Sequence, residues 1–195
     1  DAIRWPMQPT PVLAQLPYTR QVLAALGTVI GRSRLMRIDR EAEVTPHVDA
    51  AHYWWERVRV HVPVITDASV RFEVGDATAH LAAGEVWAVD TWRRHRVVNP
   101  ALRARIHLVV DTVGSPSFWE LVARSAASPD DEVRVIPNRL GADLDYPTET
   151  VNQPRVMTPW EIALTLDALD AELRPLDPEG ADQLAAALQG FRRAW

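Results

Sequence analysis

The feature that most constrains the fold is a strict two-residue alternation over residues 57–65. One set of positions carries cationic or imidazole side chains, namely Arg57, Arg59 and His61. The alternate set consists of four valines: Val58, Val60, Val62 and Val64. Because successive side chains of a β-strand point to opposite faces, this pattern predicts a strand with one apolar and one basic face.

A second segment, residues 103–110, repeats this arrangement. Arg103, Arg105, His107 and Val109 would share one face, opposite a fully apolar face. If helices cover the two apolar faces, both basic faces point into the interior of a barrel, where unneutralised cations are costly. A bound dicarboxylate would neutralise them, with an arginine holding its far carboxylate in a two-pronged hydrogen bond. The alternative is an open sheet whose polar face meets water.

Further short strands with turn residues between them extend the pattern. Residues 30–44 begin to alternate, with Leu35 and Ile38 as core candidates, and further strands are predicted near 70–81 and 86–90. Such spacing favours an antiparallel barrel or sandwich of the jelly-roll kind. The prolines of residues 1–18 favour an extended arm, followed by a short helix that Thr19 could cap. After Asp111 the pattern becomes helical, with a helix predicted over 159–173 and another from 177 to the C-terminus.

Composition sets further limits. The chain has 195 residues, a formal net charge of −5 and no cysteine. This length suits one domain, with a core at about 28–113 and a mostly helical extension over 114–195. The acidic balance argues against nucleic acid as a partner, and no apolar run is long enough to predict a membrane span. Without thiolates, a transition metal would need histidine or carboxylate ligands. A cytoplasmic location is the default expectation, and a homodimer is possible.

Three residues form a candidate metal site: His47, Asp49 and His95. Two imidazoles and one carboxylate on one side of a metal leave other positions open, which is typical of non-haem iron(II) sites that bind O2. Each residue also has an ordinary interpretation. The His-x-Asp pair could lie in a solvated loop, and His95 could be a surface residue in its basic run.

An ordered set of motifs makes the interpretation more specific. The chain contains HVD at 47–49, RVHVP at 59–63, GEVWAVD at 84–90, HRVVN at 95–99, and Arg105 ten residues after His95. In this order the segment from about 44 to 111 resembles the aspartyl/asparaginyl β-hydroxylase family, with similarity to free-proline hydroxylases. The resemblance implies a double-stranded β-helix (a cupin-like jelly roll), mainly β with flanking helices.

The resemblance also implies roles for individual residues. His47, Asp49 and His95 would bind Fe(II), and Arg105 would hold the far carboxylate of 2-oxoglutarate with help from His61. Arg59 would contact substrate or co-substrate, and His107, on the same face as Arg105, is a further candidate for the pocket wall. Family members from animals have glycine at the position of Asp49, so this chain is closer to the proline-hydroxylase branch. The full triad also argues against a halogenase, in which halide takes the place of the carboxylate.

The function that follows is hydroxylation of an unactivated C–H bond with 2-oxoglutarate and O2 as co-substrates. The substrate could be a free amino acid, a peptidyl aspartyl, asparaginyl or prolyl side chain, or a carrier-bound intermediate. Two other outcomes stay open. The same site could carry out desaturation or cyclisation in a biosynthetic pathway, or the chain could be a non-oxidative cupin-like module that binds a metal or small anion.

Overall fold

A computed structural model describes residues 6–49, 52–54, 56–127, 135–142, 144–150 and 159–193. Contacts divide the chain into two compact units, residues 1–153 and 154–195, which are described separately below. The first unit carries all the candidate site residues. The expectation of a single domain over residues 1–195 stays a prediction.

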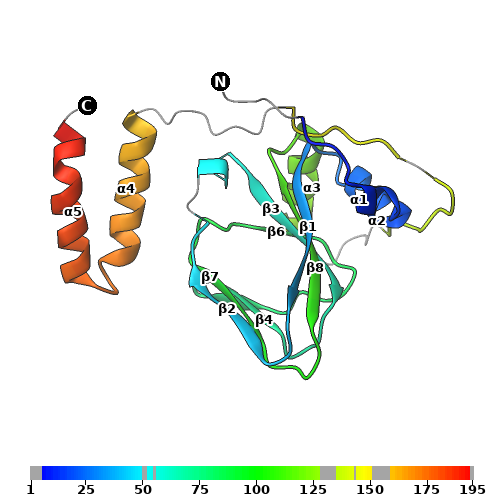
Figure 1. Ribbon diagram of the computed structural model, residues 1–195, viewed down its shortest axis with the longest axis horizontal. Helices are drawn as coiled ribbons and strands as arrows, with labels where there is room; N and C mark the ends of the chain where they lie inside the picture. Colours follow the sequence, from blue (N-terminus) through cyan, green and yellow to red (C-terminus); the bar gives the residue numbers. More distant parts are fainter. Residues whose placement is uncertain are drawn as a thin grey trace. The chain divides into compact units, whose positions relative to one another are not determined.

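The first unit is built on two four-stranded antiparallel sheets (Figure 1). The first sheet contains, in spatial order, β1 (Ile30–Ile38), β8 (Arg105–Thr112), β3 (Val58–Ile65) and β6 (Trp87–Val89). The second contains β2 (Ala42–His47), β7 (His95–Asn99), β4 (Arg71–Val74) and β5 (Ala77–Ala79). The chain passes repeatedly from one sheet to the other, which defines a double-stranded β-helix. The predicted jelly-roll fold is confirmed.

Strand register explains why the basic faces point inward. Arg59 lies opposite Asp111, and His61 lies opposite Val109, on the face of the first sheet that looks toward the second. An apolar cluster fills the rest of this inter-sheet space: Ile38, Val70, Phe72, Leu81, Val89 and Val97. The alternate residues Val60, Val62, Leu108 and Val110 form the outer face.

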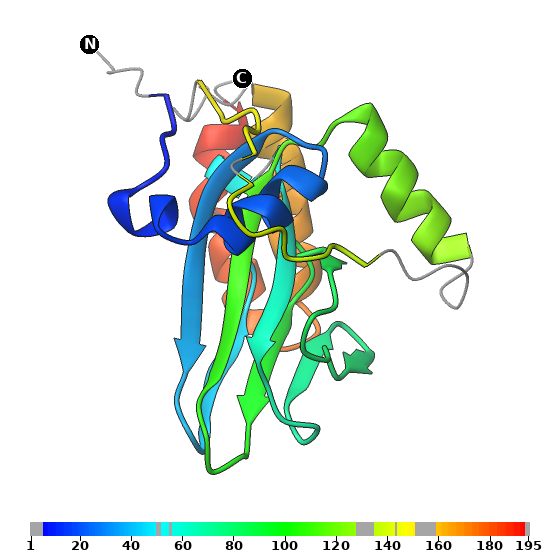
Figure 2. The same cartoon turned by 90° about the vertical axis from the view of Figure 1, so that its right-hand side faces the viewer.

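Helices cover that outer face (Figure 2). The helix α1 (Pro11–Ala14) is followed by α2 (Pro17–Ala25), and α3 (Pro116–Ala127) follows the last strand. Leu23 of α2 and Phe118 of α3 are buried against the valines of the first sheet. The predicted arrangement, with apolar faces under helices and basic faces inside, is therefore confirmed for β3 and β8.

Some local predictions were wrong. Residues 30–44 form two strands rather than one, since the chain turns at Glu41, which has φ 48°. Leu35 is 56% exposed because it lies on the edge strand β1, away from helix cover. The proline-rich start is partly helical: Thr10 caps α1, and Pro17 begins α2 at a position where its missing N–H costs nothing.

The second unit consists, over its described residues, of α4 (Pro159–Leu173) and α5 (Pro178–Arg193). Both helices were predicted from the sequence. Arg174 links the helices through ion pairs of 2.8 Å to both Asp170 and Asp182. Among the helices that the structure describes, none is both long and apolar enough to cross a membrane.

Candidate metal centre

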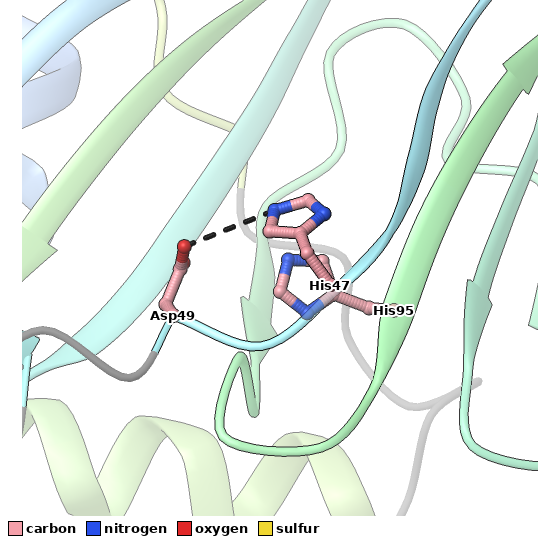
Figure 3. Close-up of side chains that lie close together, drawn as sticks. All are labelled: His47, Asp49 and His95. Carbon is pink, nitrogen blue, oxygen red and sulfur yellow. Dashed lines mark ion pairs between the residues drawn. The ribbon is translucent and has the colours of Figure 1, made fainter. Parts of the chain in front are cut away.

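The pairing of β2 with β7 brings the two candidate histidines together. His47 lies directly opposite His95 in this ladder, and their ring centroids are 4.3 Å apart. Asp49 follows two residues later, and its backbone N–H donates to the carbonyl of Thr91 at 3.0 Å. One ligand atom from each of the three residues lies within 4.8 Å of the others, and Figure 3 shows the carboxylate beside the two rings. This grouping is compact enough to hold one metal ion.

Hydrogen bonds fix the tautomer of both imidazoles. Nδ1 of His47 is 2.7 Å from the carbonyl oxygen of Thr45, and Nδ1 of His95 is 2.9 Å from that of Arg93. Because a carbonyl oxygen only accepts, each Nδ1 must carry the hydrogen. Each Nε2 then presents a lone pair. A histidine that donates through one ring nitrogen and binds through the other is the usual arrangement at protein metal sites.

The three side chains differ in their access to solvent. His95 is 5% exposed, whereas the side chain of His47 is 39% exposed and that of Asp49 11%. Burial is the main cause that lowers the pKa of His95 below its ordinary value, which favours the neutral imidazole that metal binding requires. The cluster is therefore anchored in the protein on one side and reachable from solvent on the other.

Arg59 is neutralised by two carboxylates. Its Nη1 donates to Oδ2 of Asp49 at 2.5 Å, and its Nε donates to Oδ1 of Asp111 at 2.8 Å. The other oxygen of Asp49, Oδ1, is 3.9 Å from Nε2 of His47. One oxygen of the Asp49 carboxylate therefore bonds to Arg59, and the other faces His47. The predicted contact of Arg59 with substrate or co-substrate stays a prediction.

Arg105 has no such neutralisation within the described part of the chain. It is 3% exposed, its Nη2 donates to Nδ1 of His107 at 2.6 Å, and its Nε–H has no partner there. Burial lowers the pKa of Arg105 to about 10, so the guanidinium is still charged at neutral pH. Since arginine only donates, Nδ1 of His107 must accept, and the proton of neutral His107 is on Nε2. That Nε2–H is also buried without a partner among the described residues.

A row of rings connects Arg105 with the metal cluster. The ring of His61 is 5.6 Å from that of His107 and 5.0 Å from that of Phe72, centroid to centroid. Phe72 in turn stacks on His95 at 6.3 Å. The His–Asp–His cluster and the guanidinium of Arg105 therefore belong to one continuous interior. Within the described part of the chain, Arg105 Nε–H and His107 Nε2–H are buried donors without a partner, and such donors suit a carboxylate.

The two interior histidines predict a pH dependence of folding stability. Burial, and next the charge of Arg105, lower the pKa of His107 to about 3 and that of His61 well below its ordinary value. In both cases the folded state binds fewer protons than the unfolded state below about pH 6.5, so stability is fully present above that pH and is lost as pH falls. For His107 alone, we expect the free energy of unfolding to decrease by about 1 kcal/mol as the pH falls from 6 to 5.

Chemical denaturation at several pH values would measure this effect. The slope of unfolding free energy against pH should be shallower for His107→Gln than for the unmodified protein, because glutamine does not titrate. Parallel curves for the two proteins would show that His107 is protonated equally in the folded and unfolded states. The measurements need buffers without carboxylates, since a bound anion would change the field around His107.

Sequence patterns missed two residues of this interior. Asp111, which is 0% exposed, accepts hydrogen bonds from Arg59 and, at 3.2 Å, from Nε1 of Trp54. It follows Arg105, His107 and Val109 at the same two-residue spacing, and that spacing could have placed it inside. Trp54 is the second: its ring Nε1 donates to Asp111, and its backbone carbonyl accepts from Nε1 of Trp92 at 3.1 Å.

Fold and donor cluster together define a class: double-stranded β-helix proteins with a His–Asp–His group suited to a metal ion. The family model described as aspartyl/asparaginyl beta-hydroxylase matches residues 5–114, more than half of the chain. The chain belongs to the aspartyl/asparaginyl β-hydroxylase family. The resemblance found in the motifs is thereby confirmed.

Individual proteins are also similar. L-proline cis-3-hydroxylase 1 from Streptomyces sp is 32% identical over 129 residues, which cover 63% of this chain and 44% of that protein. The chain therefore spans less than half the length of this relative. A cupin domain from Bordetella pertussis is 18% identical, with a TM-score of 0.34 over 41% of this chain and 78% of that one. The Schizosaccharomyces pombe Cnp3 cupin domain is 11% identical, with a TM-score of 0.35 over 48% and 61% respectively.

Proposed function

We propose that this protein is an Fe(II)- and 2-oxoglutarate-dependent dioxygenase that hydroxylates an unactivated C–H bond of an amino-acid substrate. The substrate would be a free amino acid or a peptidyl aspartyl, asparaginyl or prolyl residue. The similar Streptomyces protein is named for hydroxylation of L-proline, so L-proline is the first compound to test.

One observation carries the proposal. A buried arginine with an unsatisfied Nε–H shares a continuous interior with two histidines and an aspartate that could bind a metal. An unneutralised buried guanidinium is costly, and a carboxylate removes that cost. A module that only binds a metal has no use for this arginine. A co-substrate with a chelating end and a distant carboxylate uses both features.

Different residues would bind the iron and the 2-oxoglutarate. Nε2 of His47, Nε2 of His95 and one oxygen of Asp49 would hold the iron, with the second oxygen of Asp49 kept on Arg59. Arg105 and His107 would bind the far carboxylate of 2-oxoglutarate, since both have a free buried donor in the described structure. The neighbouring His61, kept neutral by burial, would add no charge to this region. The half-exposed side of His47 would leave the substrate a way in.

Bound iron with 2-oxoglutarate and O2 would supply the oxidising power for hydroxylation, and 2-oxoglutarate would leave as succinate and CO2. The protein contributes position and electrostatics. It fixes both imidazole tautomers, holds one oxygen of Asp49 on Arg59, and places a buried guanidinium in the same interior as the metal cluster.

The test begins under nitrogen with Fe(II) and 2-oxoglutarate. A weak visible absorption band that needs both components would indicate chelation at the metal. Air is then admitted, and succinate is measured with L-proline, L-aspartate, L-asparagine and short peptides that contain them. Succinate that rises with one of these compounds, together with a product 16 mass units heavier, is the expected result. Failure to bind either Fe(II) or 2-oxoglutarate would contradict the proposal.

A further inference from the structure

Asp111 is a fully buried carboxylate whose position in the fold is set by β8. It is 0% exposed and lies opposite Arg59 in the β3–β8 ladder. Its Oδ1 accepts from Nε of Arg59 at 2.8 Å, and its Oδ2 accepts from Nε1 of Trp54 at 3.2 Å. Arg34 on β1 adds a longer ion pair of 3.6 Å to Oδ2. Burying a charge this deeply is costly unless such partners surround it.

These contacts fix the orientation of the Arg59 guanidinium group. Asp111 engages the Nε side of the planar group, where Nη2 also reaches Oδ2 at 3.5 Å. That leaves Nη1 to point at Oδ2 of Asp49. The guanidinium carbon is 5.1 Å from the centre of the Trp54 ring, a cation–π contact that limits its movement on another side.

Further hydrogen bonds link the loop that carries Asp49 to Asp111. The backbone N–H of Asp49 is held by Thr91, and Trp92, the next residue, donates through Nε1 to the carbonyl of Trp54. Trp54 donates through its own Nε1 to Asp111. Arg59 connects Asp111 with Asp49, because it donates to both carboxylates. Both the backbone and the side chain of Asp49 are thus positioned by groups that do not themselves belong to the cluster.

We propose that Asp111 is a positioning residue that acts through Arg59 to make Asp49 a one-oxygen metal ligand. With Oδ2 held by Arg59, only Oδ1 faces the histidines, and a chelating two-oxygen contact with the metal is prevented. An additional coordination position thereby stays open for co-substrate and O2. This inference rests on the proposed function, because it assigns Asp111 a role in the same metal centre.

The test uses Co(II) as a spectroscopic probe in the whole chain. Asp111→Asn preserves the shape of the side chain but removes the charge that holds Arg59. We expect Co(II) affinity to fall by about 10- to 100-fold, as for other residues that support metal ligands, and the visible Co(II) spectrum to change in position and intensity. Equal affinity and an unchanged spectrum in Asp111→Asn would overturn the inference, while absence of Co(II) binding by the unmodified protein would instead contradict the metal centre itself.

A matched control separates positioning from loss of stability. Glu149 is 4% exposed and bonds to Nε of Arg57 at 2.6 Å, so it forms a second buried ion pair close to the same loop. No contact between Glu149 and Asp49 is present among the described residues. Glu149→Gln should lower thermal stability as Asp111→Asn does, yet leave the Co(II) spectrum unchanged. Equal spectral changes in both variants would mean that any damage near the loop has this effect, and would overturn the inference.

A double-mutant cycle covers the case in which Asp111→Asn folds poorly. Arg59→Met combined with Asp111→Asn removes both charges and leaves no unpaired ion between these two residues. If Asp111 acts through Arg59, the double variant should bind Co(II) as Arg59→Met does, with the same spectrum. A loss of Co(II) affinity in the double variant beyond that of Arg59→Met alone would show that Asp111 acts by a route other than Arg59, and would overturn the inference.

Discussion

Replacement of Arg105 with methionine is expected to raise the 2-oxoglutarate concentration needed for half-saturation by about 100-fold or more. Removal of one partner from a buried, hydrogen-bonded charge pair costs about 2–5 kcal/mol, and about 1.4 kcal/mol corresponds to tenfold. Arg105 is the buried cation that has no carboxylate partner within the described structure, so the co-substrate should depend strongly on it. Fe(II) affinity should change little, since Arg105 is separated from the cluster by His61 and Phe72.

Anaerobic titration of 2-oxoglutarate followed by the visible band, together with succinate formation in air, would measure both quantities. Arg105→Lys should recover only part of the affinity, because an ammonium group cannot reproduce the planar fork of arginine. Arg103→Met is the matched control: the side chain of Arg103 lies on the same segment but is 62% exposed. Unchanged affinity in Arg105→Met, or an equal loss in Arg103→Met, would assign the co-substrate carboxylate to another part of the chain.

The inward basic face could be predicted from sequence because it depends on two local facts. Alternation over residues 57–65 and 103–110 fixes which side chains share a face, and the need to bury valines decides which face points outward. Arg105 and His107 are therefore inside for the reason that the pattern gives. His47 and His95 were harder to pair, since their juxtaposition depends on the β2–β7 register.

The partners of the interior charges could not be predicted in this way. The ion pair from Arg59 to Asp49 and Asp111 joins three separate parts of the chain, and alternation gives no information about which carboxylate meets which cation. The segment at 147–149 is a second example. It lies along the edge of β1 through hydrogen bonds to Ile30 and brings Glu149 to Arg57, more than ninety residues away in the chain. A single isolated bridge produces no periodic pattern in the sequence, so it could not be predicted from alternation.

The position of Asp49 leads to the second large expected effect. Asp49→Ala should weaken Fe(II) binding by at least about 100-fold, because loss of a ligand should cost no less than loss of a residue that supports one. A second cause acts in the same direction. Arg59 would lose its Nη1 partner, and its positive charge beside the cluster would be balanced by Asp111 alone. Succinate formation should fall to the level seen without protein.

Asp90→Ala is the control for this variant. Asp90 is an exposed aspartate that caps the turn before His95, where its Oδ1 accepts from the backbone N–H of Trp92 at 3.0 Å. It is not part of the three-residue cluster, so Fe(II) affinity should be retained. The Fe(II) affinity of Asp49→Asn should lie between those of Asp49→Ala and Asp90→Ala. Its amide oxygen can still approach a metal but carries no charge. Retention of Fe(II) affinity and succinate formation in Asp49→Ala would mean that the two histidines suffice, and Asp49 would then serve chiefly to neutralise Arg59.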